Sequence, residues 1–187
     1  MRIALFGGSF DPPHVGHFLA AGYVLATAEV DRVWLMPVHR HPFGKRMADF
    51  EHRVEMCRRM ASLFSGGVEV SRVEEEVPGE GRTVDTLEYL AAKHPACRFR
   101  LVIGSDIIGD APLWKRFDRV VALAPPILLA RGGHPHPEAR GPVLPEVSST
   151  EVRARLASGD EPWELVTRPV LEYIRSRGLY LGEPTAR

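Results

Sequence analysis

The N-terminal stretch limits the fold more than any other part of the sequence. Residues 3–6 are the apolar run Ile-Ala-Leu-Phe, and Gly-Gly-Ser-Phe-Asp-Pro-Pro-His-Val-Gly-His follows over residues 7–17. The apolar run is typical of a buried β-strand, and the two prolines favour a turn that leads into a helix near His14. We expect Gly7 and Gly8 to let the backbone turn sharply and approach a ligand. A strand, a turn and a helix therefore open the chain, as in parallel α/β proteins.

The rest of the sequence continues this alternation. Strands are predicted at residues 3–6, 33–36, 68–70, 99–103 and 127–130, and helices at 14–27, 50–64, 83–93, 112–118, 149–158 and 169–177. We expect residues 1–187 to form one α/β domain, a doubly wound parallel sheet of the Rossmann-like type, with C-terminal helices and a short tail at about 182–187. Residues 37–48 and 132–146 are predicted loops, and long loops at the strand ends of such sheets carry ligand sites.

Composition excludes several classes of protein. The 24 basic and 24 acidic residues cancel, so no global charge indicates a nucleic-acid or membrane-surface partner. No apolar stretch approaches the roughly 20 residues that span a bilayer, and the N-terminus lacks a signal-peptide core. Cys57 and Cys97 form no CxxC pair, so we expect packing roles in a reducing compartment. These features predict a cytoplasmic protein without nucleic-acid or membrane partners.

Two histidines stand at the start of the first predicted helix. His14 and His17 are three residues apart, so they share one face of the first turn, where free amide hydrogens and the helix dipole favour an anion. Imidazoles donate hydrogen bonds to phosphate oxygens and, when protonated, offset charge on a leaving pyrophosphate. The alternatives are a surface pair or part of a metal site, but the Glu of HExxH is absent, as are GxxxxGK[ST], GxGxxG and GxSxG. The predicted ligand is a nucleoside triphosphate.

Residues 7–17 resemble the signature of the HxGH nucleotidyltransferase superfamily, which contains adenylyl- and cytidylyltransferases. Its pattern is a Gly followed by (S/T)FDPxHxGH after the first strand, and this sequence matches it without a gap. In the superfamily both histidines contact the triphosphate. The resemblance thus implies that His14 and His17 bind phosphate and act in catalysis.

A second motif opens a predicted helix near the C-terminus. Val-Ser-Ser-Thr-Glu-Val-Arg over residues 147–153 contains a capping box, Ser148 with Glu151, which alone explains a helix start. Three hydroxyls and an arginine on one turn also suit an anion. The run resembles the superfamily's ISSTxIR motif, which implies that Arg153 is catalytic and that two helix N-termini clamp one triphosphate. The implied ATP site comprises Gly7, Gly8, Ser9, Phe10, Asp11, His14, His17, Gly104, Asp106, Ser148, Ser149, Thr150 and Arg153.

Within the superfamily the chain is most similar to the bacterial nicotinate-nucleotide adenylyltransferases. Lys45, on the loop before a His-Arg pair, resembles the family's P-x-K element and could reach phosphates during catalysis, although a solvated charge explains it equally well. Thr86 lies in a segment similar to the family's SYTxxTL, but Gly81 and Arg82 replace Ser-Tyr there. Thr83 is independently a good helix cap.

Two further residues complete the predicted acceptor site. Asp106 lies in a Gly-Ser-Asp run that resembles the family's GxD, and a carboxylate suits ribose hydroxyls. Trp114 matches a family tryptophan near the pyridine ring, with core packing as the alternative. We therefore expect Thr86, Asp106 and Trp114 to bind the acceptor. His39, His41, His134 and His136 lack acidic or thiol partners in the sequence and are interpreted as incidental, so no protein metal site is predicted.

The resemblance implies transfer of AMP from ATP to nicotinate mononucleotide, which gives nicotinate adenine dinucleotide and pyrophosphate in NAD biosynthesis. Mg²⁺ is expected on the substrate phosphates, since no cage of carboxylates is evident. One alternative is the same chemistry on another acceptor, namely nicotinamide mononucleotide, phosphopantetheine or a cytidylyl acceptor. Two further alternatives are a non-catalytic nucleotide-binding regulator and an oxidoreductase. Whether the chain forms a homo-oligomer is left open.

Overall fold

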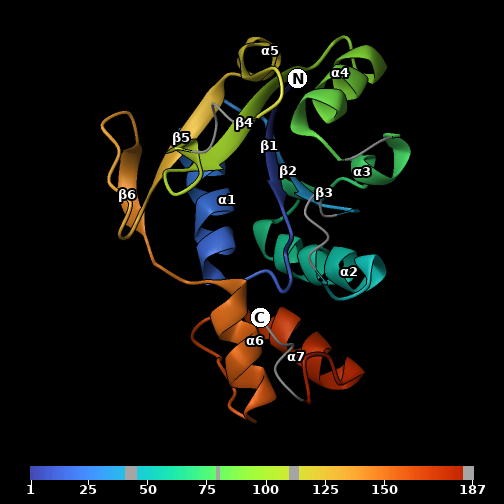
Figure 1. Ribbon diagram of the computed structural model, residues 1–187, viewed down its shortest axis with the longest axis vertical. Helices are drawn as coiled ribbons and strands as arrows, with labels where there is room; N and C mark the ends of the chain where they lie inside the picture. Colours follow the sequence, from blue (N-terminus) through green and yellow to red (C-terminus); the bar gives the residue numbers. More distant parts are fainter. Residues whose placement is uncertain (41–45, 79–80, 110–113, 183–187) are drawn as a thin grey trace.

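The fold is a parallel sheet covered by helices on both faces (Figure 1). The computed structural model describes residues 1–40, 46–78, 81–109 and 114–182. Its strands are β1 (Arg2–Gly8), β2 (Arg32–Pro37), β3 (Val68–Val70), β4 (Arg98–Gly104), β5 (Pro126–Arg131) and β6 (Arg140–Leu144). Neighbouring strands are all parallel, in the order β3-β2-β1-β4-β5-β6. The predicted doubly wound α/β class is confirmed.

The helices connect the strands and extend the chain beyond the sheet. They are α1 (Val15–Thr27), α2 (Phe50–Ala61), α3 (Val73–Glu76), α4 (Thr83–Lys93), α5 (Phe117–Leu123), α6 (Ser149–Ala157) and α7 (Arg168–Arg177), with a 3₁₀ turn, η1 (Ser62–Phe64). Figure 1 shows α6 and α7 together below the sheet, with α6 next to the N-terminal start of α1. Within the described ranges no helix combines the length and apolar character needed to cross a membrane.

Alternating side chains on the strands separate two cores. Ala4 faces a core shared with α1, α2, α6 and α7, whereas Ile3 and Leu5 face one shared with α3, α4 and α5. Burying each large apolar side chain stabilises the fold by about 1.5–3 kcal/mol. Cys57 is fully buried in the first core and Cys97 packs against the second, which agrees with the packing roles expected of both.

The structure corrects several predicted boundaries. The strand β6 lies inside the segment 132–146, so the prediction of a loop over that whole segment is wrong. The Gly-Pro pair of β6 hid its strand pattern in the sequence, and the proline is tolerated because β6 is an edge strand. The short helix predicted at 112–118 is wrong in its bounds, since α5 begins at Phe117 and residues 112–113 lie outside the described ranges. The helix predicted at 50–64 ends at Ala61 and tightens into η1, and α3 is a single turn that the apolar pattern did not reveal.

The strand order places a crevice between β1 and β4. In this order the connections leave β1 and β4 in opposite directions, and ligands bind outside the carboxyl ends of the strands at that point. The strand β1 ends at Gly8 and β4 ends at Gly104. Both are followed by residues that the sequence predicts to bind nucleotide.

Candidate functional site

The two motif histidines are packed together where α1 begins. His14 is the N-cap of α1, and the centroids of the His14 and His17 rings are 3.8 Å apart. The main-chain N–H of His14 donates to Nδ1 of His17 at 3.2 Å. A neutral His17 must therefore carry its proton on Nε2, which makes Nε2 a donor. A Cβ at Gly16 would lie 3.1 Å from the His14 ring, so the glycine makes room for that imidazole.

The turn before this helix differs from the prediction for Gly7 and Gly8. Both glycines are still part of β1, paired with Met36 and Pro37 of β2. The reversal comes at Phe10, whose φ is +48°, and at the following cis Asp11-Pro12 bond. The predicted sharp turn at the two glycines is therefore wrong, because continued pairing with β2 keeps them extended. The Phe10 side chain is 1% exposed and its ring centroid lies 4.8 Å from that of His17, so this side chain supports the histidine by packing.

Burial and a nearby arginine keep both histidines neutral. Loss of water around the ring, together with the smaller effect of the Arg131 charge, lowers the pKa of His14 to about 3. The pKa of His17 is also held well below its ordinary value, first by burial, then by His14 and by Arg131. An empty site thus presents neutral imidazoles beside a cation, and a bound anion would raise both pKa values.

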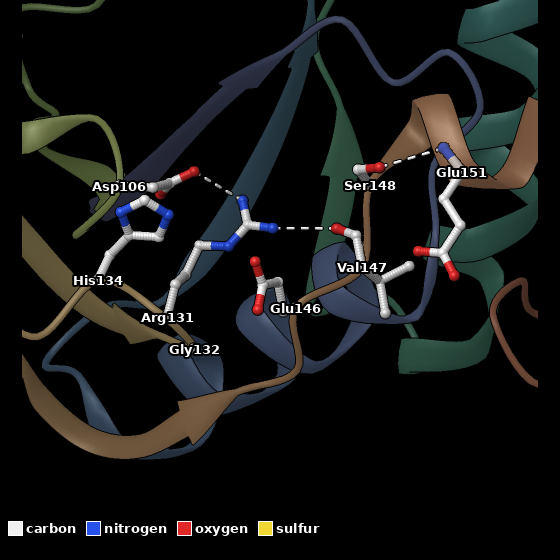
Figure 2. Close-up of a pocket in the computed structure, with 8 residues that line it drawn as sticks. All are labelled: Asp106, Arg131, Gly132, His134, Glu146, Val147, Ser148 and Glu151. Atoms are coloured by element: carbon white, nitrogen blue, oxygen red, sulfur yellow. Dashed lines mark hydrogen bonds and ion pairs between the residues drawn. The ribbon is translucent and has the colours of Figure 1, made fainter.

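Arg131 is a site residue that the sequence did not indicate. It ends β5, at a place where the register with β6 shifts. Its Nη1 donates to Oδ2 of Asp106 at 3.0 Å and its Nη2 to the carbonyl of Val147 at 3.0 Å. The side chain therefore joins the end of β4 to the segment that leads into the second motif (Figure 2). Only its place after an apolar strand could have singled it out, because the strand ends of a parallel sheet carry ligand residues.

A pocket of about 410 Å³ opens around Arg131. Its lining comes from the ends of β4 and β5 and from the start of α6, as Figure 2 shows: Asp106, Arg131, Gly132, His134, Glu146, Val147, Ser148 and Glu151. Asp106 and Ser148, predicted from separate motifs, thus line one cavity. A Cβ at Gly104 would lie 2.2 Å from Oδ1 of Asp106, so that glycine lets the carboxylate fold back over the strand end. His134, interpreted as incidental from the sequence, lies in the lining.

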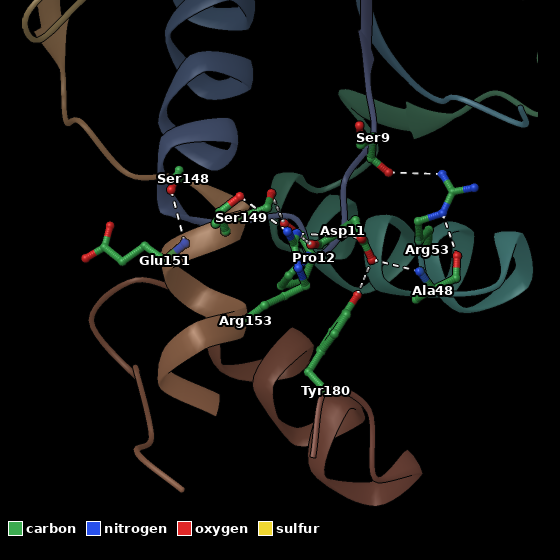
Figure 3. Close-up of polar contacts among 11 residues, drawn as sticks. Ser9, Asp11, Pro12, Ala48, Arg53, Ser148, Ser149, Glu151, Arg153 and Tyr180 are labelled. Carbon is green, nitrogen blue, oxygen red and sulfur yellow. Dashed lines mark hydrogen bonds and ion pairs between the residues drawn. The ribbon is translucent and has the colours of Figure 1, made fainter. Parts of the chain in front are cut away.

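The second motif begins α6 and touches the first motif directly. Ser148 is the N-cap of α6, and its hydroxyl accepts the N–H of Glu151 at 3.1 Å, so the predicted capping box is present on its serine side. The Ser149 hydroxyl donates to the carbonyl of Pro12 at 2.9 Å (Figure 3). Arg153 Nη1 donates to the Asp11 carbonyl at 2.6 Å. The two predicted motifs are therefore one structural unit.

Two site atoms are buried without a hydrogen-bond partner. Among the described residues, three buried side-chain polar atoms lack one: His14 Nδ1, Asp106 Oδ1 and Thr167 Oγ1. Native proteins pair nearly all such atoms, so each exception calls for an explanation such as a missing ligand or ion. Two of the three belong to predicted site residues, His14 at the start of α1 and Asp106 just after β4. Their unpaired atoms favour a polar ligand at this edge of the sheet.

Two of the three predicted acceptor residues, Thr86 and Trp114, are outside the lining of the pocket around Arg131. Thr86 is 1% exposed, and its hydroxyl donates to Oε1 of Glu74 at 2.9 Å. Burial raises the pKa of Glu74, and the Thr86 hydrogen bond opposes that rise. Trp114 meets Phe117 edge to face at 6.1 Å and packs against the second core.

The helix cap predicted at Thr83 is wrong. Thr83 is the first residue of α4, and Arg82 holds the cap position without a side-chain capping bond. Lys45 and His41 lie outside the described residues.

The strand order, the histidine pair and the second motif together define an α/β protein of the nucleotide-binding, Rossmann-like class. A family model described as cytidylyltransferase-like matches residues 5–155, which contain both motifs. A probable nicotinate-nucleotide adenylyltransferase from Myxococcus xanthus (strain DK1622) is 52% identical over 180 residues, covering 96% of this chain and 95% of the relative. One from Anaeromyxobacter sp. (strain K) is 52% identical over 184 residues, covering 97% of each. Within the cytidylyltransferase-like class, the chain belongs to the nicotinate-nucleotide adenylyltransferase family.

A solved structure supports the fold independently of sequence. The nicotinic acid mononucleotide adenylyltransferase of Plasmodium falciparum, complexed with NaAD, superposes with a TM-score of 0.80 over 96% of this chain and 97% of that one. Only 20% of the residues are identical, so the likeness concerns the fold.

Proposed function

We propose that the protein transfers AMP from ATP to nicotinate mononucleotide, forming nicotinate adenine dinucleotide and pyrophosphate in NAD synthesis. Membership of a family whose relatives carry this name at 52% identity is the observation that supports it most strongly. A solved relative of the same fold was complexed with NaAD, the dinucleotide that this reaction makes. The reaction, the small-molecule substrates and the cytoplasmic location expected from the sequence form one consistent proposal.

The acceptor needs no general base in this reaction. A phosphate monoester carries about −1.5 to −2 charge at neutral pH, so one of its oxygens can attack the α-phosphorus directly. The new oxygen–phosphorus bond forms as the bond to the bridging oxygen of pyrophosphate breaks, and the electron pair leaves with pyrophosphate. The protein's contribution is then positioning and charge stabilisation.

Different residues are proposed to position the substrates and to stabilise their charge. The Nε2–H of His17 donates to the triphosphate, the positive end of the α1 dipole attracts it, and Arg153 acts from the start of α6. Ser148 and Asp106 hold the adenosine end in the pocket around Arg131. Thr86, Asp106 and Trp114 remain the proposed acceptor contacts, and Lys45 a proposed phosphate contact. For Thr86 to reach the nicotinate carboxylate, its hydroxyl must leave Glu74.

Mg²⁺ enters this proposal as part of the substrate MgATP. Among the described residues no group of three or more His, Cys, Asp or Glu is placed to hold a metal ion. Asp11 bonds Tyr180 and Ala48 through Oδ1, and Asp106 bonds Arg131 through Oδ2. The donors that remain are imidazoles, amides and guanidinium groups, which suit phosphate oxygens better than a cation.

A pyrophosphate-release assay with MgATP and either the acid or the amide mononucleotide tests the proposal. We expect turnover with nicotinate mononucleotide and much weaker turnover with nicotinamide mononucleotide. Equal rates would show dual specificity, and release with neither acceptor would refute the proposed function. Phosphopantetheine serves as the control acceptor.

His17→Ala tests the catalytic assignment. The variant removes the donor at Nε2 and the acceptor of the His14 N–H, so we expect turnover to fall by about 10²–10³, the loss typical of one removed oxyanion donor. Circular dichroism and the unfolding midpoint should stay close to wild type. His94→Ala, at the end of α4, is the control and should keep its activity. Near-normal turnover in His17→Ala would remove the assignment.

A further inference from the structure

A residue near the C-terminal end of the described chain bonds a residue of the first motif. The phenol of Tyr180 donates to Oδ1 of Asp11 at 2.8 Å, across 169 positions of sequence. Asp11 is 1% exposed and belongs to the turn between β1 and α1. Tyr180 follows α7, and Figure 3 shows its side chain reaching up to the turn.

The carboxylate of Asp11 is held from two directions. Its Oδ1 accepts both the Tyr180 hydroxyl and the main-chain N–H of Ala48, the latter at 3.1 Å. With Oδ1 fixed in this way, Oδ2 lies 3.6 Å from Nη1 of Arg153. The same Nη1 also donates to the main-chain carbonyl of Asp11. Asp11 therefore sets the direction of the Arg153 guanidinium, and Tyr180 helps to set Asp11.

Tyr180 is suited to act as a permanent donor. Burial raises its pKa far above the ordinary value, and the negative charge of Asp11 adds to the rise. Its φ of +61° is a left-handed conformation that a tyrosine rarely adopts. The N–H of Leu179 donates to the carbonyl of Ile174 at 3.0 Å and keeps the chain against the end of α7 at this point. The unfavourable backbone is thus maintained where it delivers the hydroxyl to the motif.

We propose that Tyr180 is a positioning residue for adenylyl transfer, which orients the Arg153 guanidinium through the Asp11 carboxylate. The inference rests on the proposed role of Arg153 at the triphosphate. It adds that the C-terminal segment after α7 completes the active site. The competing reading is that the Tyr180 hydroxyl only stabilises the fold.

Tyr180→Phe, with Tyr173→Phe as its matched control, separates these readings. Tyr173 lies on α7, is 6% exposed, and its hydroxyl bonds Nδ1 of His52 at 2.9 Å, so both variants lose one buried phenol hydrogen bond. We expect similar falls in the unfolding midpoint. Only Tyr180→Phe should lower kcat, by about tenfold, with a smaller change in KM for ATP, because Arg153 acts on charge that develops in the transition state.

A double-mutant cycle with Arg153→Lys tests whether Tyr180 affects kcat through Arg153. If Tyr180 acts through Arg153, Tyr180→Phe should lower kcat much less in the Arg153→Lys background than in the wild type. Independent, multiplicative losses would overturn the proposal, as would equal kcat values for Tyr180→Phe and Tyr173→Phe. If the wild type releases no pyrophosphate, the proposed function fails separately, and the NMR signal of the Arg153 Nε–H decides: a shift of that signal in Tyr180→Phe but not in Tyr173→Phe supports the positioning role, and an unchanged signal in both variants refutes it.

Discussion

At the scale of single residues, the contact between His14 and His17 limits the charge that the site can carry. A proton on either ring would place a cation against its neighbour and near Arg131, in surroundings that exclude water. We expect both rings to be neutral at pH 7 in the free protein and to gain positive charge only as an anion binds. The positive charge near the two rings in the free protein then comes from Arg131 and Arg153.

Arg131→Met should show this coupling. Removing the guanidinium takes away a charge that lowers the pKa of His14, so that pKa should rise above its wild-type value of about 3. Loss of one charge-assisted contact worth about 1.5–3 kcal/mol should weaken ATP binding roughly tenfold or more. NMR titration of the imidazoles and calorimetry with ATP measure both effects. Arg100→Met is the control, since Arg100 bonds the carbonyls of Pro125 and Pro126 instead.

The candidate site residues that the sequence indicated belong to short motifs, in which they lie close together along the chain. His14 and His17 lie three residues apart at the start of α1, and Ser148, Ser149 and Arg153 lie at the start of α6. A short sequence pattern was therefore enough to indicate each group. Arg131 was missed because its partners, Asp106 and Val147, are 25 and 16 positions away and meet it only once the sheet has formed. An unchanged His14 titration in Arg131→Met would show that this long-range assignment is mistaken.

At the scale of elements, the site depends on where two helices begin. The helix α1 starts at the end of β1, and α6 starts with Ser148 at the pocket edge. The hydroxyl of Ser149 and the guanidinium of Arg153 fasten α6 to the turn before α1. Two helix N-termini, each equivalent to about half a positive charge, are thereby held close to one another. A chain with zero net charge can bind a polyanion in this way.

Ser148→Ala tests the start of α6. The variant loses the side-chain acceptor for the Glu151 N–H, and we expect the free energy of unfolding to fall by about 1 kcal/mol. Urea denaturation measures the loss, and ATP binding should weaken as the helix start frays. Ser158→Ala, whose hydroxyl donates to the Arg155 carbonyl at the other end of the same helix, should change ATP binding far less. Equal losses of binding in the two variants would count against the N-terminal site.

Elements with a recognisable apolar pattern were predicted, whereas β6 and α3 were not. The strands β1, β2, β4 and β5 have apolar runs, β3 has a valine on each side of Glu69, and α1, α2, α4, α6 and α7 have apolar faces, which is why their existence could be inferred. The strand β6 contains Gly141 and Pro142, and α3 is four residues long, so neither has a periodicity to detect. Their positions follow from the sheet edge and the packing around them rather than from their own residues.

At the scale of the whole molecule, buried neutral histidines tie stability to pH. In the unfolded chain a histidine titrates near 6.5, whereas the pKa of folded His14 is about 3. Between these values the unfolded state binds more protons, so stability falls as the pH drops from 6.5 towards 3. His17 shifts in the same direction.

Urea denaturation at pH 7 and pH 5 tests this linkage. We expect a loss of at most about 2 kcal/mol for each of the two histidines between pH 6.5 and pH 5. The variant that carries both His14→Gln and His17→Gln should show a flatter dependence over that range, whereas His94→Gln should follow the wild type. Saturating ATP should also flatten the wild-type curve, because the anion favours the protonated rings. Parallel curves for the wild type and the double variant would contradict the burial argument.

The hydrogen bond between Tyr180 and Asp11 joins two residues that the ribosome adds at very different times. A ribosome adds about 5–20 residues per second, so the histidine motif is synthesised on the order of ten seconds before the tyrosine that completes its surroundings. Until then the nascent chain carries the turn at Asp11 without the hydroxyl that bonds its carboxylate. The candidate site is therefore complete only after synthesis has passed Tyr180.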